Sequence, residues 1–413
     1  MADKSGLQLV GELFDPASRA DPYPIYAEFR ALGPVWIEEI SSMVVTGYRD
    51  CDALLRDPRL SAERRRFFQP DEAADPYPPD APSSVRQPWF LSLDAPDHTR
   101  LRRLVSKAFT ARAIARMEDS IARLVDELLD RVADQETFDV VSGLAYSLPV
   151  AVICRMLGVP SADERLFHRW SAQLTRMLDG FPSPDDRNDE IPEWVPGMVD
   201  MHRYVNELVA DRRKRPRRDD LISELIAAED GGDMLSHDEL VSTIVLLLVA
   251  GHETTVNLIA NGVLALLRHP AHLAALRADS GTASAVVEEV LRYDPPVQLT
   301  ARLATEDLHV GKVKLPAGGL AILLLAAAHR DPEANPDPDR FDPAREQVRH
   351  LGFSAGPHYC LGAPLARIEG RLALAAFARR VREPELVAAP PYRGHINLRG
   401  VSELLVSHAG VTR

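Results

Sequence analysis

The segment "FSAGPHYCLGAPLAR", residues 353–367, decides the fold. It places Cys360 between a glycine-rich turn and the start of a helix with regularly spaced apolar residues. A thiol at a helix N-terminus lies in the positive end of the helix dipole and can accept backbone N–H hydrogen bonds, which lowers its pKa. The flanking glycines, Gly356 and Gly362, let the backbone approach a flat partner closely. These residues alone leave two interpretations open: a buried structural cysteine, or a thiolate that acts as a ligand or a nucleophile.

His358 lies two residues before Cys360 in the same segment. In an extended loop this spacing points both side chains to roughly the same side. It therefore suits a second contact with one bound group better than base catalysis. The other two cysteines, Cys51 and Cys154, have no neighbouring ligand residues, and we expect them to pack between helices.

Composition limits the class of protein. The chain has 413 residues, 46% hydrophobic and 26% charged, as in soluble globular proteins, and its length alone suggests two or three domains. A formal net charge of −13 argues against nucleic-acid binding, which needs a broad excess of Lys and Arg. The opening residues carry no secretory signal, and the longest charge-free apolar run, residues 241–251, is shorter than the roughly 20 residues of a membrane span. Three cysteines form no disulfide framework, so we expect a soluble cytoplasmic protein with reduced thiols and no membrane contact.

Helical periodicity dominates the chain. Apolar residues recur at i, i+3 and i+4 spacing over residues 96–109, 111–134, 144–157, 163–178, 198–213 and 361–382. Strand-type runs are fewer: an expected hairpin at 34–39 and 43–46, runs within 313–332, and the tail at 395–407. Residues 64–88 are rich in Pro, Asp and Ser and predict a long loop. The sequence therefore predicts a mainly α protein with a minor, separated β portion.

One long helix is predicted from Ser236 to His269. Ser236 as N-cap and Glu239 three residues later form a capping box. The first half of this helix is apolar on every face. A helix without a polar face is buried, so we expect it to run through the middle of the molecule.

The stretch "AGHETT", residues 250–255, interrupts this apolar helix. A buried carboxylate at Glu253 must be paired or perform a task. The Thr254 hydroxyl can bond back to the carbonyl of Ala250, and Gly251 weakens the same turn. We therefore expect the helix to open there and to leave a groove.

Two further patterns concern charged residues on helices. In "EEVLRYDPP", Glu289 and Arg292 lie one turn apart, a pair worth only about 0.2 to 0.5 kcal/mol on a helix surface. In "DAPDHTRLRRLVSKAF", helical geometry puts His98 and Arg102 on one face. The opposite face carries Arg100, Arg103 and Lys107. One face can thus offer cations to the interior, and the other is either a docking surface or simply solvated.

Phe353, Gly356, Cys360 and Gly362, in the order F-x-x-G-x-x-x-C-x-G, resemble the haem-binding signature of cytochrome P450 enzymes, in which the cysteine thiolate is the axial ligand of haem iron. The resemblance runs from "DPYPIYAEFR" to "NLRGVSELLV". It implies a single cytochrome P450 domain over residues 1–413, a helix-rich prism with haem b between the long central helix and the Cys360 helix. Ser354 departs from the pattern, since many members have a second glycine there; we expect only a small effect on loop geometry.

The resemblance also implies roles for the other patterns. "AGHET" matches the family's A-G-x-[DE]-T, in which Ala250 and Gly251 belong to the oxygen-binding groove beside the haem. Glu253 and Thr254 are then the acid and alcohol that deliver protons, with Thr255 as a less favoured stand-in.

The charged patterns likewise match family features. His98, Arg102, Arg302 and His358 match the haem-propionate contacts. Glu289 and Arg292 match the structural E-x-x-R pair, for which the expected partner is an Arg or His of the proline-rich segment before the cysteine loop, with Arg340 as a candidate. The outward basic face suits a small acidic electron donor.

The implied reaction is monooxygenation of a hydrophobic small molecule, by hydroxylation or epoxidation, with electrons from a ferredoxin and its reductase. The wording "LLLVAGHETTVNLIANG" resembles soluble bacterial members that tailor polyketides and macrolides, so we expect a secondary-metabolite intermediate as substrate and a monomeric enzyme. Two alternatives remain: a peroxide-driven peroxygenase, and a haem-thiolate protein that binds a ligand without turnover. An intact Glu253 and Thr254 pair argues against both.

The substrate pocket is expected where apolar segments meet. These are the loop near residue 89, residues 181–205, the central helix before Ala250, residues 297–301 and the tail. The expected contacts are Trp89, Phe90, Val249, Val297, Leu299 and Ile396. Mostly apolar side chains predict a hydrophobic, fairly bulky ligand.

Overall fold

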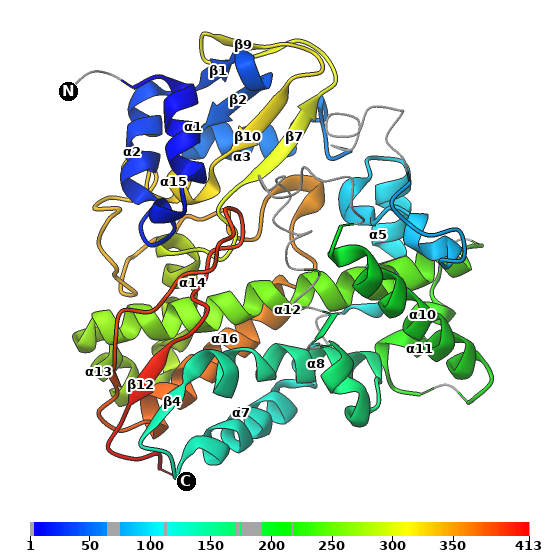
Figure 1. Ribbon diagram of the computed structural model, residues 1–413, viewed down its shortest axis with the longest axis vertical. Helices are drawn as coiled ribbons and strands as arrows, with labels where there is room; N and C mark the ends of the chain where they lie inside the picture. Colours follow the sequence, from blue (N-terminus) through cyan, green and yellow to red (C-terminus); the bar gives the residue numbers. More distant parts are fainter. Residues whose placement is uncertain are drawn as a thin grey trace.

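A long helix, α12 (His237–Arg268), crosses the middle of the computed structural model, with a sheet-containing part on one side and further helices on the other (Figure 1). The structure describes residues 4–63, 75–110, 114–167, 169–170, 174, 192–216, 218–230 and 232–412. Within these residues the chain is mainly helical with minor sheets, as the sequence predicts. The expectation of one domain over residues 1–413 stays a prediction.

The other helices of the described residues fall before and after α12. Those before it are α1 (Gly6–Phe14), α2 (Tyr23–Leu32), α3 (Tyr48–Arg56), α5 (Asp97–Ala108), α7 (Glu118–Val132), α8 (Ser147–Leu157), α10 (Trp194–Arg213) and α11 (Leu221–Ala227). Those after it are α13 (Pro270–Ala278), α14 (Ala283–Tyr293), α15 (Leu325–His329) and α16 (Ala363–Arg380).

The main sheet has five strands in the order β1-β2-β10-β7-β3. They are β1 (Val35–Ile37), β2 (Ser42–Val45), β3 (Leu60–Ser61), β7 (Thr300–Ala304) and β10 (Leu320–Leu323). The expected hairpin is confirmed, since Trp36 of β1 pairs with Met43 of β2 in antiparallel register. β10 lies parallel to β2, so the sheet joins chain segments far apart in sequence.

Three smaller sheets complete the β portion. In the first, β12 (Leu405–Ser407) pairs with both β4 (Thr137–Asp139) and β11 (Glu385–Leu386). The second pairs β5 (Glu229–Asp230) with β6 (Asp233–Met234), and the third pairs β8 (Leu308–Val310) with β9 (Val313–Leu315). β12 lies between β4 and β11, so the end of the chain is held against a segment before α8.

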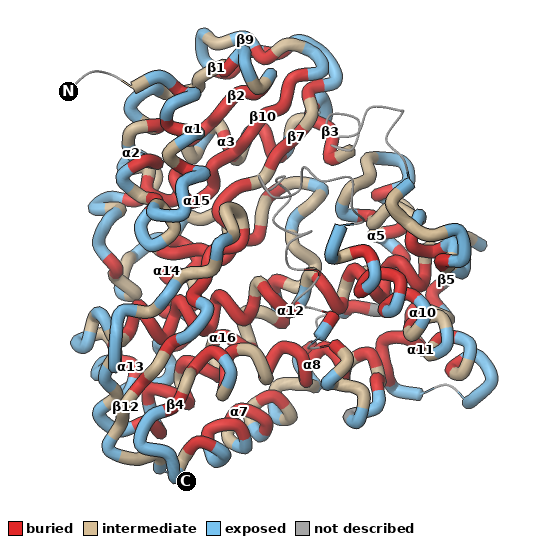
Figure 2. The backbone as a smooth tube through the Cα atoms, in the orientation of Figure 1, coloured by how far each residue is buried: buried red, intermediate tan, exposed pale blue. Residues whose placement is uncertain are grey.

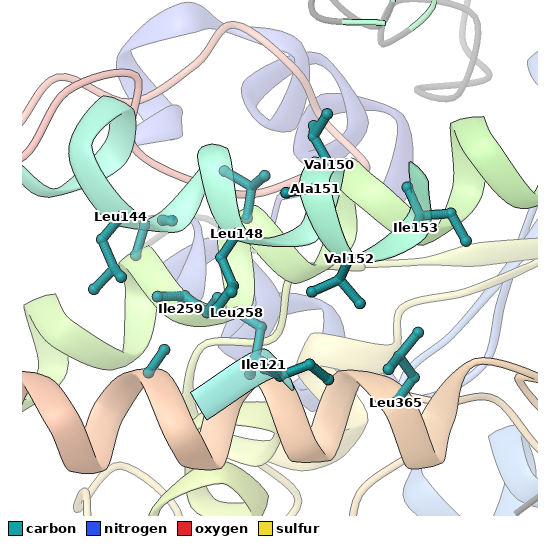
Figure 3. Close-up of a cluster of buried hydrophobic side chains, with 14 of the residues drawn as sticks. Ile121, Leu144, Leu148, Val150, Ala151, Val152, Ile153, Leu258, Ile259 and Leu365 are labelled. Carbon is teal, nitrogen blue, oxygen red and sulfur yellow. The ribbon is translucent and has the colours of Figure 1, made fainter. Parts of the chain in front are cut away.

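The central helix is buried as predicted. Ser236 and Glu239 form both bonds of the capping box at its start. α12 has the length and apolar composition of a membrane-crossing helix, but 78% of its most apolar window is buried inside the protein. Figure 2 shows it as largely buried, and in Figure 3 Leu258 and Ile259 lie among side chains of the α8 region, above α16. Its apolar surface is therefore covered by other helices of the same chain.

Several helix boundaries differ from the expected ones. Of the helix expected at 111–134, α7 covers Glu118–Val132, and acidic Glu118 and Asp119 lie in its first turn. Residues 114–115 are also helical and a turn at 116–117 separates them from α7, whereas residues 111–113 lie outside the described part of the chain. The helix expected at 144–157 is preceded by a π-turn over Val141–Ala145, and α10 begins at Trp194, four residues before the expected start. The helix expected at 163–178 and the loop at 64–88 lie partly outside the described residues.

Glu289 and Arg292 form a fully buried ion pair, whereas their spacing in the sequence predicts only a weak pair on a helix surface. Both side chains are 0% exposed, and two guanidinium nitrogens of Arg292 lie 2.7 Å from the two carboxylate oxygens of Glu289. Arg292 also donates to the carbonyls of Pro338 and Arg340, at 2.7 and 2.9 Å. The pair thus ties α14 to the proline-rich segment before the cysteine loop.

The prediction that Arg340 is the third partner of this pair is wrong. Its guanidinium is 65% exposed and pairs with Asp342 at 2.9 Å. Arg345 takes the place instead: its Nε lies 3.2 Å from Glu289 Oε1, and its side chain is 9% exposed. Arg345 also donates to the carbonyls of Asp337 and Arg340, because the segment curls around its guanidinium.

Arg345→Ala should lower the free energy of unfolding by about 2 kcal/mol, because hydrogen bonds to a buried charged group are lost. Arg340→Ala is the matched control and should stay within about 0.5 kcal/mol of wild type, since that side chain is exposed. Denaturant unfolding of both variants measures the difference. Equal effects of the two substitutions would contradict the assignment of Arg345.

Candidate functional site

The loop before α16 holds Cys360 in a partly buried position against the main hydrophobic core. The backbone N–H of Cys360 donates to the carbonyl of Phe353 at 2.9 Å and closes the loop. A 3-10 turn over Gly356–His358 lies inside it. Gly356 has φ +65°, and a Cβ there would lie 2.6 Å from the carbonyl oxygen of Leu55. Only glycine fits this position without a shift of the backbone.

Ser354 adopts the conformation that a glycine would adopt more easily. Its φ is +60°, in the left-handed region. Its hydroxyl is buried and has no hydrogen-bond partner among the described residues. The serine is strained in this backbone, and the expectation that it changes the loop geometry only slightly stays a prediction.

The pKa of the Cys360 thiol is raised, whereas the sequence predicts that it is lowered. Burial raises this pKa, and the backbone N–H groups of Gly362 and Ala363 and the Arg102 guanidinium counter it only in part. The helix N-terminus therefore contributes as expected but is outweighed by burial. A coordinating metal ion deprotonates such a thiol outright.

Four predicted residues converge beside this loop. The His98 and His358 rings stack with centroids 4.1 Å apart, and Arg102 donates to the carbonyl of Tyr359. Arg302 of β7 is 7% exposed and donates to the Ala301 carbonyl at 2.8 Å. Helix α5, strand β7 and the cysteine loop thus supply one basic cluster.

The electrostatics of this cluster favour neutral imidazoles beside fixed cations. Burial, then the nearby His98, lowers the pKa of His358 to about 3. Burial, then Arg102, lowers the pKa of His98. The positive charge near neutral pH is therefore that of Arg102 and Arg302, which suits carboxylates of a bound group.

The central helix is open at Gly251. This residue is exposed in the middle of a buried helix, and a Cβ added there would meet nothing within 4 Å. Thr254 Oγ1 donates to the Ala250 carbonyl at 3.1 Å, as predicted, and Thr255 Oγ1 donates to the Gly251 carbonyl at 3.3 Å. α12 continues through residues 250–255, so the expected opening of the helix is a gap beside it and not a break in it.

Glu253 points into the protein. It is 2% exposed and forms an ion pair with the guanidinium of Arg393. His252 Nδ1 lies 3.9 Å from its other oxygen, and the His252 ring meets the Tyr146 ring edge-on at 4.5 Å. The buried carboxylate is thus paired, as elementary electrostatics requires.

The outward basic face is smaller than the sequence predicts. Arg100 forms an ion pair with Glu239 and lies 3.5 Å from Asp233, with its side chain 29% exposed. It therefore ties α5 to the start of α12. Arg103 and Lys107 are exposed.

The expected substrate contacts fall into two groups. Trp89, Val297 and Ile396 are half-buried, whereas Phe90, Val249 and Leu299 are buried in hydrophobic clusters. Residues 297–299 and 396–398 lie side by side through a bridge between Val297 and Leu398. Residues 181–191 lie outside the described part of the chain.

Sequence reasoning missed Arg393. It is one of many arginines, in a tail without periodicity, and no local signal marks it. Its partner Glu253 lies 140 positions earlier, so only the folded chain brings them together.

Comparisons with known proteins match this chain to one protein family. A family model described as "Cytochrome P450" matches residues 71–382. The vitamin D(3) 25-hydroxylase of Pseudonocardia autotrophica is 40% identical over 414 residues, covering 96% of each chain. The 6-deoxyerythronolide B hydroxylase of Saccharopolyspora erythraea is 37% identical over 407 residues, 96% of this chain and 98% of that protein. The crystal structure of ligand-free CYP164A2 of Mycobacterium smegmatis is 48% identical with a TM-score of 0.88, covering 97% of this chain and 99% of that chain.

The residues around Cys360 fit the haem-thiolate group of cytochrome P450 proteins. His98 Nε2 is buried without a hydrogen-bond partner among the described residues and can donate to a carboxylate. Arg102 and Arg302 supply the charge. The open space at Gly251 can receive a flat group that no Cβ obstructs.

Ser354→Gly should raise the free energy of unfolding by about 1 kcal/mol, because glycine adopts a positive φ without the steric cost of a Cβ. Ser280→Gly, at an exposed serine in a short 3-10 turn, is the control and should lower it by up to about 1 kcal/mol. Denaturant unfolding of both proteins is the measurement. A Ser354→Gly protein less stable than wild type would show that the backbone at 354 is not strained.

Proposed function

Since the chain belongs to the cytochrome P450 family and is therefore a haem-thiolate monooxygenase, we propose that it hydroxylates a hydrophobic small molecule, such as a polyketide or macrolide intermediate. One observation carries the proposal: the basic cluster of α5, β7 and the cysteine loop lies beside Cys360, and open space adjoins α12 at Gly251. Similar proteins named as hydroxylases favour hydroxylation over epoxidation.

Each residue of the cluster has a role in holding the cofactor. Cys360 would supply the thiolate ligand, and Gly362 leaves its sulfur clear, with a Cβ position 3.8 Å away. The haem carboxylates would be held by His98, Arg102, Arg302 and His358. Phe353 and Gly356 shape the loop, and Ala250 and Gly251 leave room on the α12 side. Haem with a thiolate ligand supplies the activation of dioxygen, from which one oxygen atom enters the substrate.

Thr254 and Glu253 deliver protons in this proposal. The Thr254 hydroxyl donates to the Ala250 carbonyl, so its oxygen is held in one orientation and can accept a hydrogen bond. Glu253 is one residue earlier and buried, so a proton that it carries is shielded from bulk water. General acids placed in this way contribute typically about 10² to 10⁴-fold to a rate.

The substrate site is proposed between α12, the loop near Trp89 and the paired segments at 297–299 and 396–398. Trp89, Val297 and Ile396 are the favoured contacts because each is only half-buried. Phe90, Val249 and Leu299 then form the wall behind them. Such an apolar lining favours a bulky hydrophobic substrate.

Bacterial cytochrome P450 enzymes act on small substrates with the help of redox partners. Here we propose a ferredoxin and its reductase, with Arg103 and Lys107 as part of the docking face. The acidic net charge argues against a nucleic-acid partner, and the burial of α12 inside the protein argues against a membrane span there. We propose a cytoplasmic monomer without membrane contact.

Cys360→Ser should abolish the long-wavelength Soret band that a thiolate-ligated ferrous haem shows with carbon monoxide. Cys154→Ala, at a buried cysteine in α8, should keep the band. Absorption spectra of the reduced, carbon monoxide-treated proteins provide the measurement. A band that survives Cys360→Ser would remove the thiolate assignment.

Thr254→Ala should keep that band but reduce the fraction of NAD(P)H consumption that yields product by about tenfold or more, because the hydroxyl that delivers protons is lost. Thr255→Ala is the matched control, since its hydroxyl bonds the next carbonyl along α12. Product and NAD(P)H are measured with a compound that shifts the Soret band on binding. If Thr255→Ala uncouples turnover and Thr254→Ala does not, the role belongs to Thr255.

A further inference from the structure

The proposed proton donor, Glu253, forms an ion pair with Arg393, whose side chain is the more exposed of the two. Glu253 is 2% exposed on its side chain and Arg393 is 17% exposed. Arg393 is therefore the more accessible member of the pair. It belongs to the tail segment after α16, drawn in red in Figure 1.

The guanidinium of Arg393 is held in a fixed orientation. Its Nε donates to the Val401 carbonyl at 3.3 Å, while Nη1 meets Glu253. The backbone N–H of Arg393 donates to the Gly400 carbonyl at 3.0 Å. The side chain is thus anchored at both its base and its head.

The tail segment is itself fixed against α12. Asn261 Nδ2 donates to the carbonyls of Arg399 and Asp294, at 3.2 and 3.1 Å. Asn257 is 0% exposed and packs so closely on Gly400 that a Cβ there would lie 2.0 Å from its Oδ1. Glu253, Asn257 and Asn261 are spaced by four residues, so one face of α12 carries all three contacts.

Few other charged or titratable groups face Glu253. Among the described residues, its recorded neighbours are His252 on α12, at 3.9 Å, and Arg393. Tyr146, just before α8, contacts the His252 ring. Burial lowers the pKa of Arg393, but an arginine remains charged near neutral pH because its ordinary pKa is above about 12. The permanent cation at this carboxylate is that of Arg393.

We propose that Arg393 is a positioning residue that keeps Glu253 ionised and oriented between turnovers, and that the protons Glu253 delivers enter past this contact. The inference rests on the proposed role of Glu253 in proton delivery. It adds a residue from the tail segment, which also contains the proposed substrate contact Ile396.

The sign of the electrostatic effect follows from burial. A buried carboxylate without a cation favours its neutral form, so loss of Arg393 raises the pKa of Glu253. The ionised fraction at neutral pH then falls. A lysine at position 393 keeps the charge but loses the planar fork that contacts both Val401 and Glu253.

The first experiment measures the carboxyl group directly, by infrared spectroscopy of the ferric, substrate-free holoenzyme as a function of pH. Arg393→Ala should give a protonated-carboxyl band that titrates about 1 to 3 pH units higher than in wild type. Glu253→Gln identifies the band by removing it. Arg393→Lys should titrate near wild type. An unchanged midpoint in Arg393→Ala would overturn the proposal.

The second experiment measures the fraction of NAD(P)H converted to product across a pH series. Arg393→Ala should shift this profile to higher pH, and the shift should vanish in the Glu253→Gln background. Arg371→Ala, which breaks a surface pair with Glu118, is the control and should leave the profile unchanged. A profile that Arg393→Ala lowers at every pH without shifting it would assign Arg393 a purely structural role and overturn the proposal.

The two hypotheses fail in different ways. If Glu253→Gln leaves coupling unchanged, the proton-delivery role of Glu253 is wrong even where the infrared midpoint moves with Arg393. If Glu253→Gln uncouples turnover and the midpoint does not move, only the inference about Arg393 fails.

Discussion

The burial of α12 along most of its length is the constraint on which the rest of the structure depends. A 32-residue helix with so little polar surface must be covered along its length, and α8, α10, α14 and α16 supply that cover. Covering it brings α16, and with it the cysteine loop, to the same core as residues 250–255. The proposed cofactor and proton-delivery residues therefore meet as a consequence of packing that is needed for stability in any case.

Polar groups inside this packing determine how the cysteine loop is fixed. The Glu289, Arg292 and Arg345 network has no exposed carboxylate, so its charges must be satisfied by one another and by backbone carbonyls. Those carbonyls belong to the segment that leads into the loop. A buried ion pair of this kind is weak evidence for net stability, but it specifies one path for the chain. The left-handed backbone at Ser354 and Gly356 completes that path.

The sequence predicted the features that local periodicity and spacing encode. The capping box at Ser236, the burial of α12, the β1-β2 hairpin and the bond from Thr254 to Ala250 are all confirmed. Pairs between distant residues were harder to predict from the sequence. Arg340 and Arg345 are both arginines of one irregular segment, and only the curvature of that segment brings Arg345, and not Arg340, to Glu289. The ion pair of Arg100 with Glu239 and that of Arg393 with Glu253 join elements more than 100 residues apart, which no periodic pattern records.

Two buried carboxyl groups on facing helices show what a cation changes. Glu369 of α16 is 2% exposed, forms no ion pair among the described residues, and burial alone raises its pKa to about 8. Glu253 of α12 is equally buried, but it meets Arg393. Burial alone therefore favours a carboxyl that keeps its proton near neutral pH, whereas burial with a fixed cation favours one that has released it. A group that must give and regain a proton in each cycle needs the second environment, with a cation that can be approached from solvent.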